Sequence, residues 1–133
     1  MNLLLDTGVW WRWMTRGPLR RSLADFLEDP AHVLHLCPLS VLEAFYKVAQ
    51  RRMPAPADED WQNRIVRGFK AAAVTFSAAR LAAEWPWPHG DPIDRLLAGV
   101  AATQGLTLVH TDTRLKDLSG FPQRYFPAAG IKA

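Results

Sequence analysis

Short apolar runs that stop at an acidic residue constrain the fold of this chain more than any other feature. Residues 3–5 lead directly into Asp6, and residues 106–109 lead through two further residues to Asp112. Unbroken apolar runs of this length are typical of parallel strands buried on both faces, and α/β folds place their sites at the carboxyl ends of such strands. We therefore expect a parallel sheet with acids gathered along one edge.

The rest of the chain alternates strand and helix patterns. Strands are predicted at residues 2–6, 33–37, 73–76 and 107–110, with a short last one near 125–126. Helices are predicted at residues 7–14, 19–28, 40–52, after Asp58 or Asp60, 77–85 and 92–104. This alternation predicts an α/β fold, a three-layer α/β/α arrangement with a short, mostly parallel sheet. At 133 residues, the chain is expected to form a single domain spanning residues 1–133.

Two serines and two acids carry helix-capping signatures as well. Ser40 and Glu43 form the Ser-x-x-Glu pattern of a capping box, and Ser77 is placed to cap the helix that follows it. Asp91 stands before Pro92, which occupies the favoured first helical position, so Asp91 is expected to cap that helix. Taken one at a time, the acids of this chain are most simply explained as caps. Capping does not, however, require that two acids, Asp6 and Asp112, follow buried strands.

Helical geometry separates the candidates further. At 100° per residue, Asp94 lies at the flank of its helix's apolar face, where it can lean over the sheet edge, whereas Asp91 lies further round. Glu43 faces away from the apolar side of its helix and lies beside Lys47, with which it could pair. Carboxylates gathered at one edge raise each other's pKa unless a divalent cation lies among them, and this is the physical case for a metal site.

The cysteine content, hydropathy and net charge exclude several classes of protein. The single cysteine, Cys37, excludes an internal disulfide and is expected to be a buried small hydrophobe, so a reducing cytoplasm is the natural setting. No apolar stretch approaches the ~20 residues of a membrane span. Nor does the N-terminus resemble a signal peptide, since Asp6 interrupts the apolar run. A net charge of +3 around an acidic site suits a metal-dependent enzyme that acts on a polyanion.

Other residue types show weaker patterns. The four histidines lack metal-ligand spacing and are interpreted as surface or strand-end residues; they are His32, His35, His89 and His110. Trp87, in the loop 86–90, could stack an unpaired base, although packing within the loop is the simpler role.

Four segments together resemble the PIN-domain ribonucleases, in particular the VapC-type toxins of toxin–antitoxin pairs. They are Leu-Leu-Leu-Asp-Thr at 3–7, Leu-Ser-Val-Leu-Glu at 39–43, Asp-Pro-Ile-Asp-Arg-Leu-Leu-Ala at 91–98 and Leu-Val-His-Thr-Asp at 108–112. The resemblance spans nearly the whole chain in the right order.

This resemblance implies a PIN-like fold and a metal-dependent endoribonuclease that hydrolyses RNA phosphodiester bonds. It assigns Asp6, Glu43, Asp94 and Asp112 as the catalytic acids that hold Mg²⁺ or Mn²⁺. It also implies a small antitoxin whose disordered tail folds onto the toxin. The apolar face of helix 40–52 and the tryptophans near residues 10–13 are predicted contact surfaces for that partner or for a homodimer.

Two rival interpretations remain at this stage. The first is a PIN-like module that binds RNA or protein without cutting, which has no need for mutually repelling carboxylates. The second is a metal-dependent phosphatase on another α/β fold, but Asp6-Thr7-Gly8 lacks the second acid that such enzymes carry after the first strand.

Overall fold

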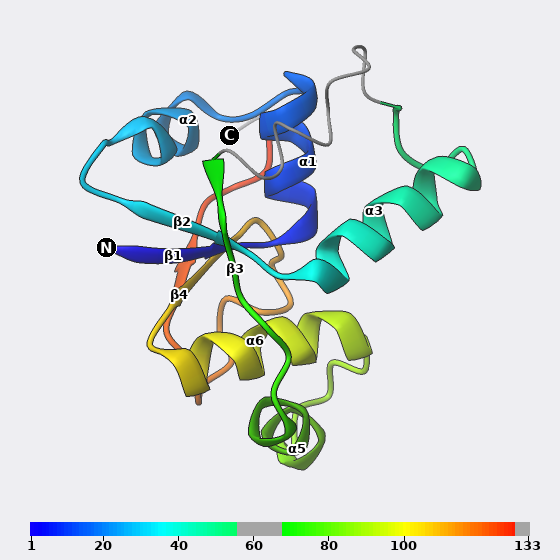
Figure 1. Cartoon of the computed structure of the whole chain (residues 1–133), viewed down its shortest axis with the longest axis vertical. Helices are drawn as coiled ribbons and strands as arrows, with labels where there is room; N and C mark the ends of the chain where they lie inside the picture. Colours follow the sequence, from blue (N-terminus) through cyan, green and yellow to red (C-terminus); the bar gives the residue numbers. More distant parts are fainter. Residues whose placement is uncertain (56–67, 130–133) are drawn as a thin grey trace.

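The computed structural model describes residues 1–55 and 68–129, in which a five-stranded sheet carries helices on both faces (Figure 1). The strands are β1 Asn2–Leu5, β2 Val33–Leu36, β3 Lys70–Ala71, β4 Thr107–His110 and β5 Gln123–Tyr125. The helices are α1 Thr7–Thr15, α2 Arg21–Glu28, α3 Pro38–Ala49, α5 Phe76–Glu84 and α6 Pro92–Gln104. The predicted α/β fold is confirmed. None of the helices in this described part is long and apolar enough to cross a membrane.

The sheet order β3-β2-β1-β4-β5 creates a switch point beside the first strand. Every neighbouring pair of strands is parallel. The chain runs outward from β1 through β2 to β3 and then returns to the other side of β1 with β4 and β5. In open parallel sheets, ligands bind in the crevice outside the carboxyl ends of the strands at such a point. Here the switch point lies between β1 and β4, so a ligand is expected beyond the carboxyl ends of these two strands.

The apolar run of β1 is buried because the sheet is covered on both faces. Leu3 and Leu5 pack in one core cluster with side chains of α1, α2 and α3, whereas Leu4 packs in a second cluster with side chains of α5 and α6. All three leucines are fully buried. In Figure 1, α1 and α2 accordingly lie on one side of the sheet and α5 and α6 on the other.

Helices α5 and α6 approach closely because a glycine lies at their contact. A Cβ atom on Gly99 would overlap the backbone carbonyl oxygen of Ala78 and lie 3.4 Å from the Cβ of Ala82. Only glycine allows this spacing without a shift of one helix, so this residue sets how α6 lies beneath the sheet.

The start of α3 differs from the prediction. The helix begins at Pro38 rather than at Ser40, and Cys37 occupies the cap position without a side-chain hydrogen bond. Proline at the first helical position is the overlooked signal, since its fixed φ suits a helix start. Ser40 is consequently a buried residue of the first turn, and the predicted capping box is wrong. The helix predicted after Asp58 or Asp60 begins outside the described residues.

The third strand and the next cap also differ from the prediction. The strand lies at Lys70–Ala71, not at residues 73–76, because that apolar run is not buried: Phe76 is 98% exposed. Thr75, rather than Ser77, caps α5, and its hydroxyl accepts a hydrogen bond from the backbone nitrogen of Ala78 at 3.1 Å.

Two of the three tryptophans near the N-terminus belong to the core. Trp10 and Trp11 are 0% and 1% exposed, and their rings meet edge to face at 5.3 Å. The Trp11 indole donates a hydrogen bond to the carbonyl oxygen of Pro54 at 2.8 Å. Their predicted role in a contact surface is therefore wrong.

Candidate metal centre

Two of the four predicted acids follow the strands on either side of the switch point. Asp6 comes directly after β1, and Asp112 comes two residues after β4, the parallel neighbour of β1. The backbone nitrogen of Asp6 donates to the carbonyl oxygen of Val109 at 3.0 Å, which fixes the two strand ends together. Asp6 precedes the first residue of α1, but its side chain makes no capping hydrogen bond. Its carboxylate is thus not used as a cap.

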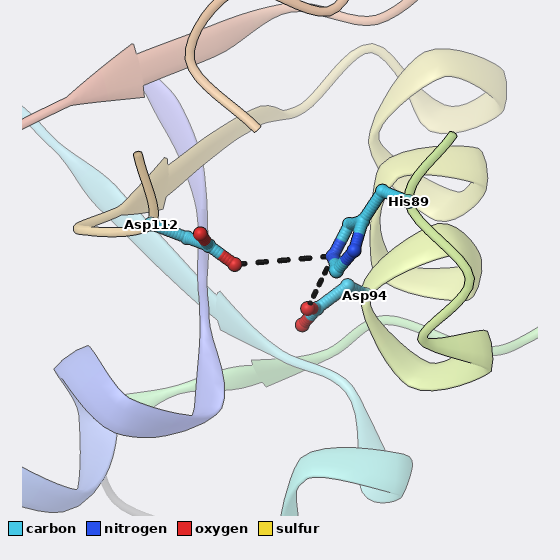
Figure 2. A group of neighbouring side chains, drawn as sticks. All are labelled: His89, Asp94 and Asp112. Atoms are coloured by element: carbon cyan, nitrogen blue, oxygen red, sulfur yellow. Dashed lines mark hydrogen bonds and ion pairs between the residues drawn. The ribbon is translucent and has the colours of Figure 1, made fainter. Parts of the chain in front are cut away.

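The start of α6 separates two nearby aspartates by role. The Asp91 side chain accepts hydrogen bonds from the backbone nitrogens of Ile93 at 3.0 Å and Asp94 at 3.4 Å. Its predicted capping role is confirmed. The Asp94 carboxylate instead points toward Asp112 and His89, as Figure 2 shows. The structure therefore brings Asp94, and not Asp91, to the strand ends.

Glu43 is more buried than its helical-wheel position suggested. Its side chain is only 11% exposed, and the Lys47 ammonium lies 3.7 Å from its carboxylate. The predicted pairing of these two residues is confirmed. The charge of Glu43 acts on Asp6, so α3 places this acid near the end of β1 even though it lies off the helix's own apolar face.

Burial and neighbouring negative charges raise the pKa of two of the acids. Burial, followed by the charges of Asp94, Glu43 and Asp112, raises the pKa of Asp6 to about 7. Burial also raises the pKa of Asp94, against the opposing effect of the hydrogen bond from His89. Such shifts are expected where carboxylates face one another without a bound cation.

Asp112 behaves differently because an arginine neutralises it. Burial alone would raise its pKa, but hydrogen bonds from the side chain and backbone of Arg114 hold the pKa below its ordinary value. The Arg114 guanidinium lies 3.0 Å from the Asp112 carboxylate and 3.9 Å from that of Asp94. Its side chain remains 65% exposed, so a cation is available at the mouth of the site.

His89 belongs to this site, and its interpretation as a surface or strand-end histidine is wrong. It is 7% exposed, and its Nε2 atom lies 2.8 Å from the Asp94 carboxylate and 3.8 Å from that of Asp112. Figure 2 shows the imidazole directed between these two acids. The only sequence signal was its place five residues before Asp94, in a loop that had to return to the sheet edge.

A second arginine holds the loop that carries His89. The Arg95 guanidinium donates to the carbonyl oxygens of Ala82 at 2.8 Å and His89 at 2.9 Å, and also to that of Trp85. The ring of Trp87 stacks on that of Trp85 at 4.1 Å, and the guanidinium lies 5.3 Å from the Trp87 centroid. Trp87 therefore packs within the loop, as the simpler interpretation predicted.

His110 supports the turn that carries Asp112. It is fully buried, and burial lowers its pKa. Its Nδ1 atom lies 3.1 Å from the backbone nitrogen of Asp112, and its Nε2 atom 2.7 Å from the side-chain oxygen of Gln123. A neutral ring that accepts at Nδ1 and donates at Nε2 satisfies both contacts.

The donor set fits a divalent cation. His89, Asp94 and Asp112 each offer a ligand atom, and these atoms lie within 4.8 Å of one another. The charges of Asp94 and Asp112, and that of Glu43, also act on Asp6. Carboxylate oxygens are the preferred ligands of Mg²⁺ and Mn²⁺, and a cation would offset the repulsion that raises the pKa of Asp6.

A cation outside the acid set lies near Asp6. A Cβ atom on Gly8 would lie 3.0 Å from the guanidinium of Arg12 and 3.7 Å from the carboxylate of Asp6. The Arg12 guanidinium and the Asp6 carboxylate thus both border Gly8, where a larger side chain would meet the guanidinium. Neither Arg12 nor Arg114 was singled out from the sequence, because their proximity to the acids depends on the turns after β1 and β4.

Comparison with known proteins identifies similar sequences and folds. A family model described as PIN domain matches residues 3–120. No curated protein matches the chain.

Solved structures share the fold at low sequence identity. VapBC2 from Rickettsia felis, bound to a DNA fragment from its promoter, has a TM-score of 0.72 at 16% identity, covering 95% of this chain and 99% of that one. A toxin–antitoxin complex from Klebsiella pneumoniae has a TM-score of 0.61 at 18% identity, with coverages of 90% and 92%. VapBC-5 from Mycobacterium tuberculosis has a TM-score of 0.56 at 18% identity, with coverages of 96% and 98%.

Proposed function

The chain belongs to the PIN domain family, and from this we propose that it is a metal-dependent endoribonuclease, the toxin of a toxin–antitoxin pair. The observation that carries the proposal is the grouping of four acids at the switch point, where burial, followed by the charges of the other three acids, raises the pKa of Asp6 to about 7. A binding module that does not cut RNA has no use for such repulsion. The free-energy cost of this repulsion is offset only when a cation binds among the acids.

In this proposal the four acids hold Mg²⁺ or Mn²⁺. They are Asp6, Glu43, Asp94 and Asp112. When bound, such an ion lowers the pKa of water and stabilises the charge that develops on a phosphodiester. The chain's own part is to place these oxygens at rigid points, two at strand ends and two in helices anchored by the core.

Two arginines are placed to receive the RNA phosphate. Arg114 extends from the site with most of its side chain exposed, and the guanidinium of Arg12 lies beside Gly8, two residues after Asp6. A guanidinium donates paired hydrogen bonds to phosphate oxygens, so these side chains orient the scissile group over the acids. The Lys47 ammonium beside Glu43 adds a third positive charge at the rim.

A partner protein follows from the same proposal. One structure that shares this fold is described as a toxin–antitoxin complex and another as a member of a family of toxin–antitoxin systems, and a small antitoxin is the corresponding partner here. Within the described residues, α3 exposes Leu42 and Tyr46, each 62% accessible, one turn apart on its outer side. Residues so placed offer an apolar strip for an antitoxin or for a second copy of the chain. Light scattering at tens of micromolar tests the homodimer, which a monomeric mass would contradict.

The deciding experiment is cleavage of total RNA by the purified protein, freed of any partner. We expect new RNA ends with Mg²⁺ or Mn²⁺ and none in excess chelator. Asp6→Asn and Asp112→Asn should abolish the cutting, whereas the matched change Asp25→Asn, on the exposed face of α2, should not. Cutting that persists undiminished in chelator would refute the metal mechanism, and RNA binding without cutting would favour a binding module.

A further inference from the structure

We propose that His89 is a nitrogen ligand of the metal held by this site, so that the centre has a mixed nitrogen and oxygen donor set. The inference rests on the proposed function, since it adds a ligand to the metal that the four acids are proposed to hold. It predicts which metals the protein prefers.

The position of the imidazole matches that of a ligand. Ligands of one octahedral ion at about 2.1 Å lie about 3.0 Å apart when adjacent and about 4.2 Å apart when opposite. The Nε2 atom of His89 is 2.8 Å from the Asp94 carboxylate and 3.8 Å from that of Asp112, within or close to these limits. One ion can therefore contact all three side chains after shifts of a few tenths of an ångström. The ion takes the place of the Nε2 proton that bonds to Asp94 in the metal-free protein, and the neutral ring then carries its proton on Nδ1.

The loop presents His89 to the site in a fixed position. The Arg95 guanidinium binds the carbonyl oxygen of His89 itself at 2.9 Å and those of Ala82 and Trp85 behind it. The stacked rings of Trp85 and Trp87 support the same turn. The His89 side chain is only 5% exposed, so its ring has little freedom to turn away from the acids. A ligand held in this way loses little conformational freedom when an ion binds.

A mixed donor set changes metal preference. Mg²⁺ strongly favours oxygen ligands, whereas imidazole nitrogen suits transition metals, whose affinity for nitrogen-containing sites rises along the first row. The protein should therefore bind Mn²⁺ more tightly than Mg²⁺, and removal of His89 should narrow that difference.

Electron paramagnetic resonance of bound Mn²⁺ tests the ligand directly. In pulsed spectra, a coordinated imidazole produces a ¹⁴N modulation. We expect this modulation in the wild-type protein and its loss in His89→Gln. The control His35→Gln removes a histidine of β2 and should retain it. Calorimetric titration should show that His89→Gln weakens Mn²⁺ binding about tenfold or more, with a much smaller effect on Mg²⁺.

Each outcome decides a different question. If Mn²⁺ binds without a ¹⁴N modulation, or if His89→Gln keeps it, His89 is not a ligand and the oxygen-only site of the proposed function stands. If the wild-type protein binds no Mn²⁺, both the inference and the metal-dependent function fail. Loss of the modulation in His89→Gln, with an unchanged circular dichroism spectrum and binding still measurable, supports the assignment.

Arg95→Lys tests the clamp that presents the ligand. Lysine retains the positive charge but cannot bind several carbonyl oxygens at once. We expect the variant to hold Mn²⁺ through the acids while the ¹⁴N modulation weakens. An unchanged modulation in a folded Arg95→Lys protein would show that the loop positions His89 without the arginine, and it would overturn the clamp.

Discussion

The raised pKa of Asp6 predicts that the metal-free protein loses stability as the pH rises. In the folded state the carboxyl keeps its proton up to a pH of about 7, against an ordinary value of 3.8. The folded protein therefore binds more protons than the unfolded chain between these values, and its stability falls across this interval as the pH increases. At 1.36 kcal/mol for each pKa unit, the ionised Asp6 destabilises the metal-free fold by roughly 4 kcal/mol at pH 8.

Asp6→Asn removes this titration while nearly preserving the shape of the side chain. In excess chelator, the variant should match the wild type below the ordinary pKa of 3.8 and become progressively more stable than it from there toward pH 8, by up to roughly 4 kcal/mol. Urea unfolding at a series of pH values measures the difference. Saturating Mn²⁺ should reverse the order, because the cation then stabilises the ionised carboxylate.

Asp25→Asn is the control for the general effect of losing a carboxylate. Asp25 lies on α2 with its side chain 65% exposed beside Arg21. The difference in free energy of unfolding between Asp25→Asn and the wild type should stay nearly constant between pH 5 and 8. If the Asp6→Asn difference is equally constant, or if that variant is the less stable protein at pH 8 without metal, the reasoning from acid crowding is wrong.

Three further predictions follow from particular contacts. Asp94→Asn should fold normally and lose nearly all RNA cleavage, whereas Asp91→Asn, which changes a helix cap, should keep cleavage and lose at most about 1 kcal/mol of stability. Cleavage assays and melting curves that give the opposite pattern would show that α6 is rotated from its position here. Gly99→Ala should lower the free energy of unfolding in urea by about 1–3 kcal/mol, because the new Cβ atom overlaps the Ala78 carbonyl. The control Gly68→Ala, which has open space around it, should change stability little. Equal effects of the two changes would refute the close contact of α5 and α6. Arg114→Ala should weaken RNA binding. It should also reduce the slope of log binding constant against log salt concentration by about 1, as the loss of one phosphate contact does. An unchanged slope in binding titrations at several salt concentrations would exclude that contact.

Local rules were sufficient where a feature depends on a short stretch of chain. The apolar residues of β1 and β4 indicated buried parallel strands, because only a sheet covered on both faces hides every side chain of such a run. Asp91 and Pro92 correctly predicted where α6 begins, because capping involves only neighbouring backbone groups. The same rules were wrong for Ser40, because the stronger start signal of Pro38 lay two residues earlier.

Features that depend on several elements were decided by the tertiary structure alone. The helical wheel relates Glu43 to its own helix, but the packing of α3 beside the sheet leaves only 11% of its side chain exposed and brings its charge to bear on Asp6. His89 has no spacing that marks it, because its approach to Asp94 and Asp112 depends on a loop clamped by Arg95. The pKa of Asp6 likewise depends on burial and on charges from α3, α6 and the turn after β4. Sequence determined which strands end in acids, and only the folded chain determined how closely those acids meet, because electrostatic repulsion depends on distances in space and not on separation along the chain.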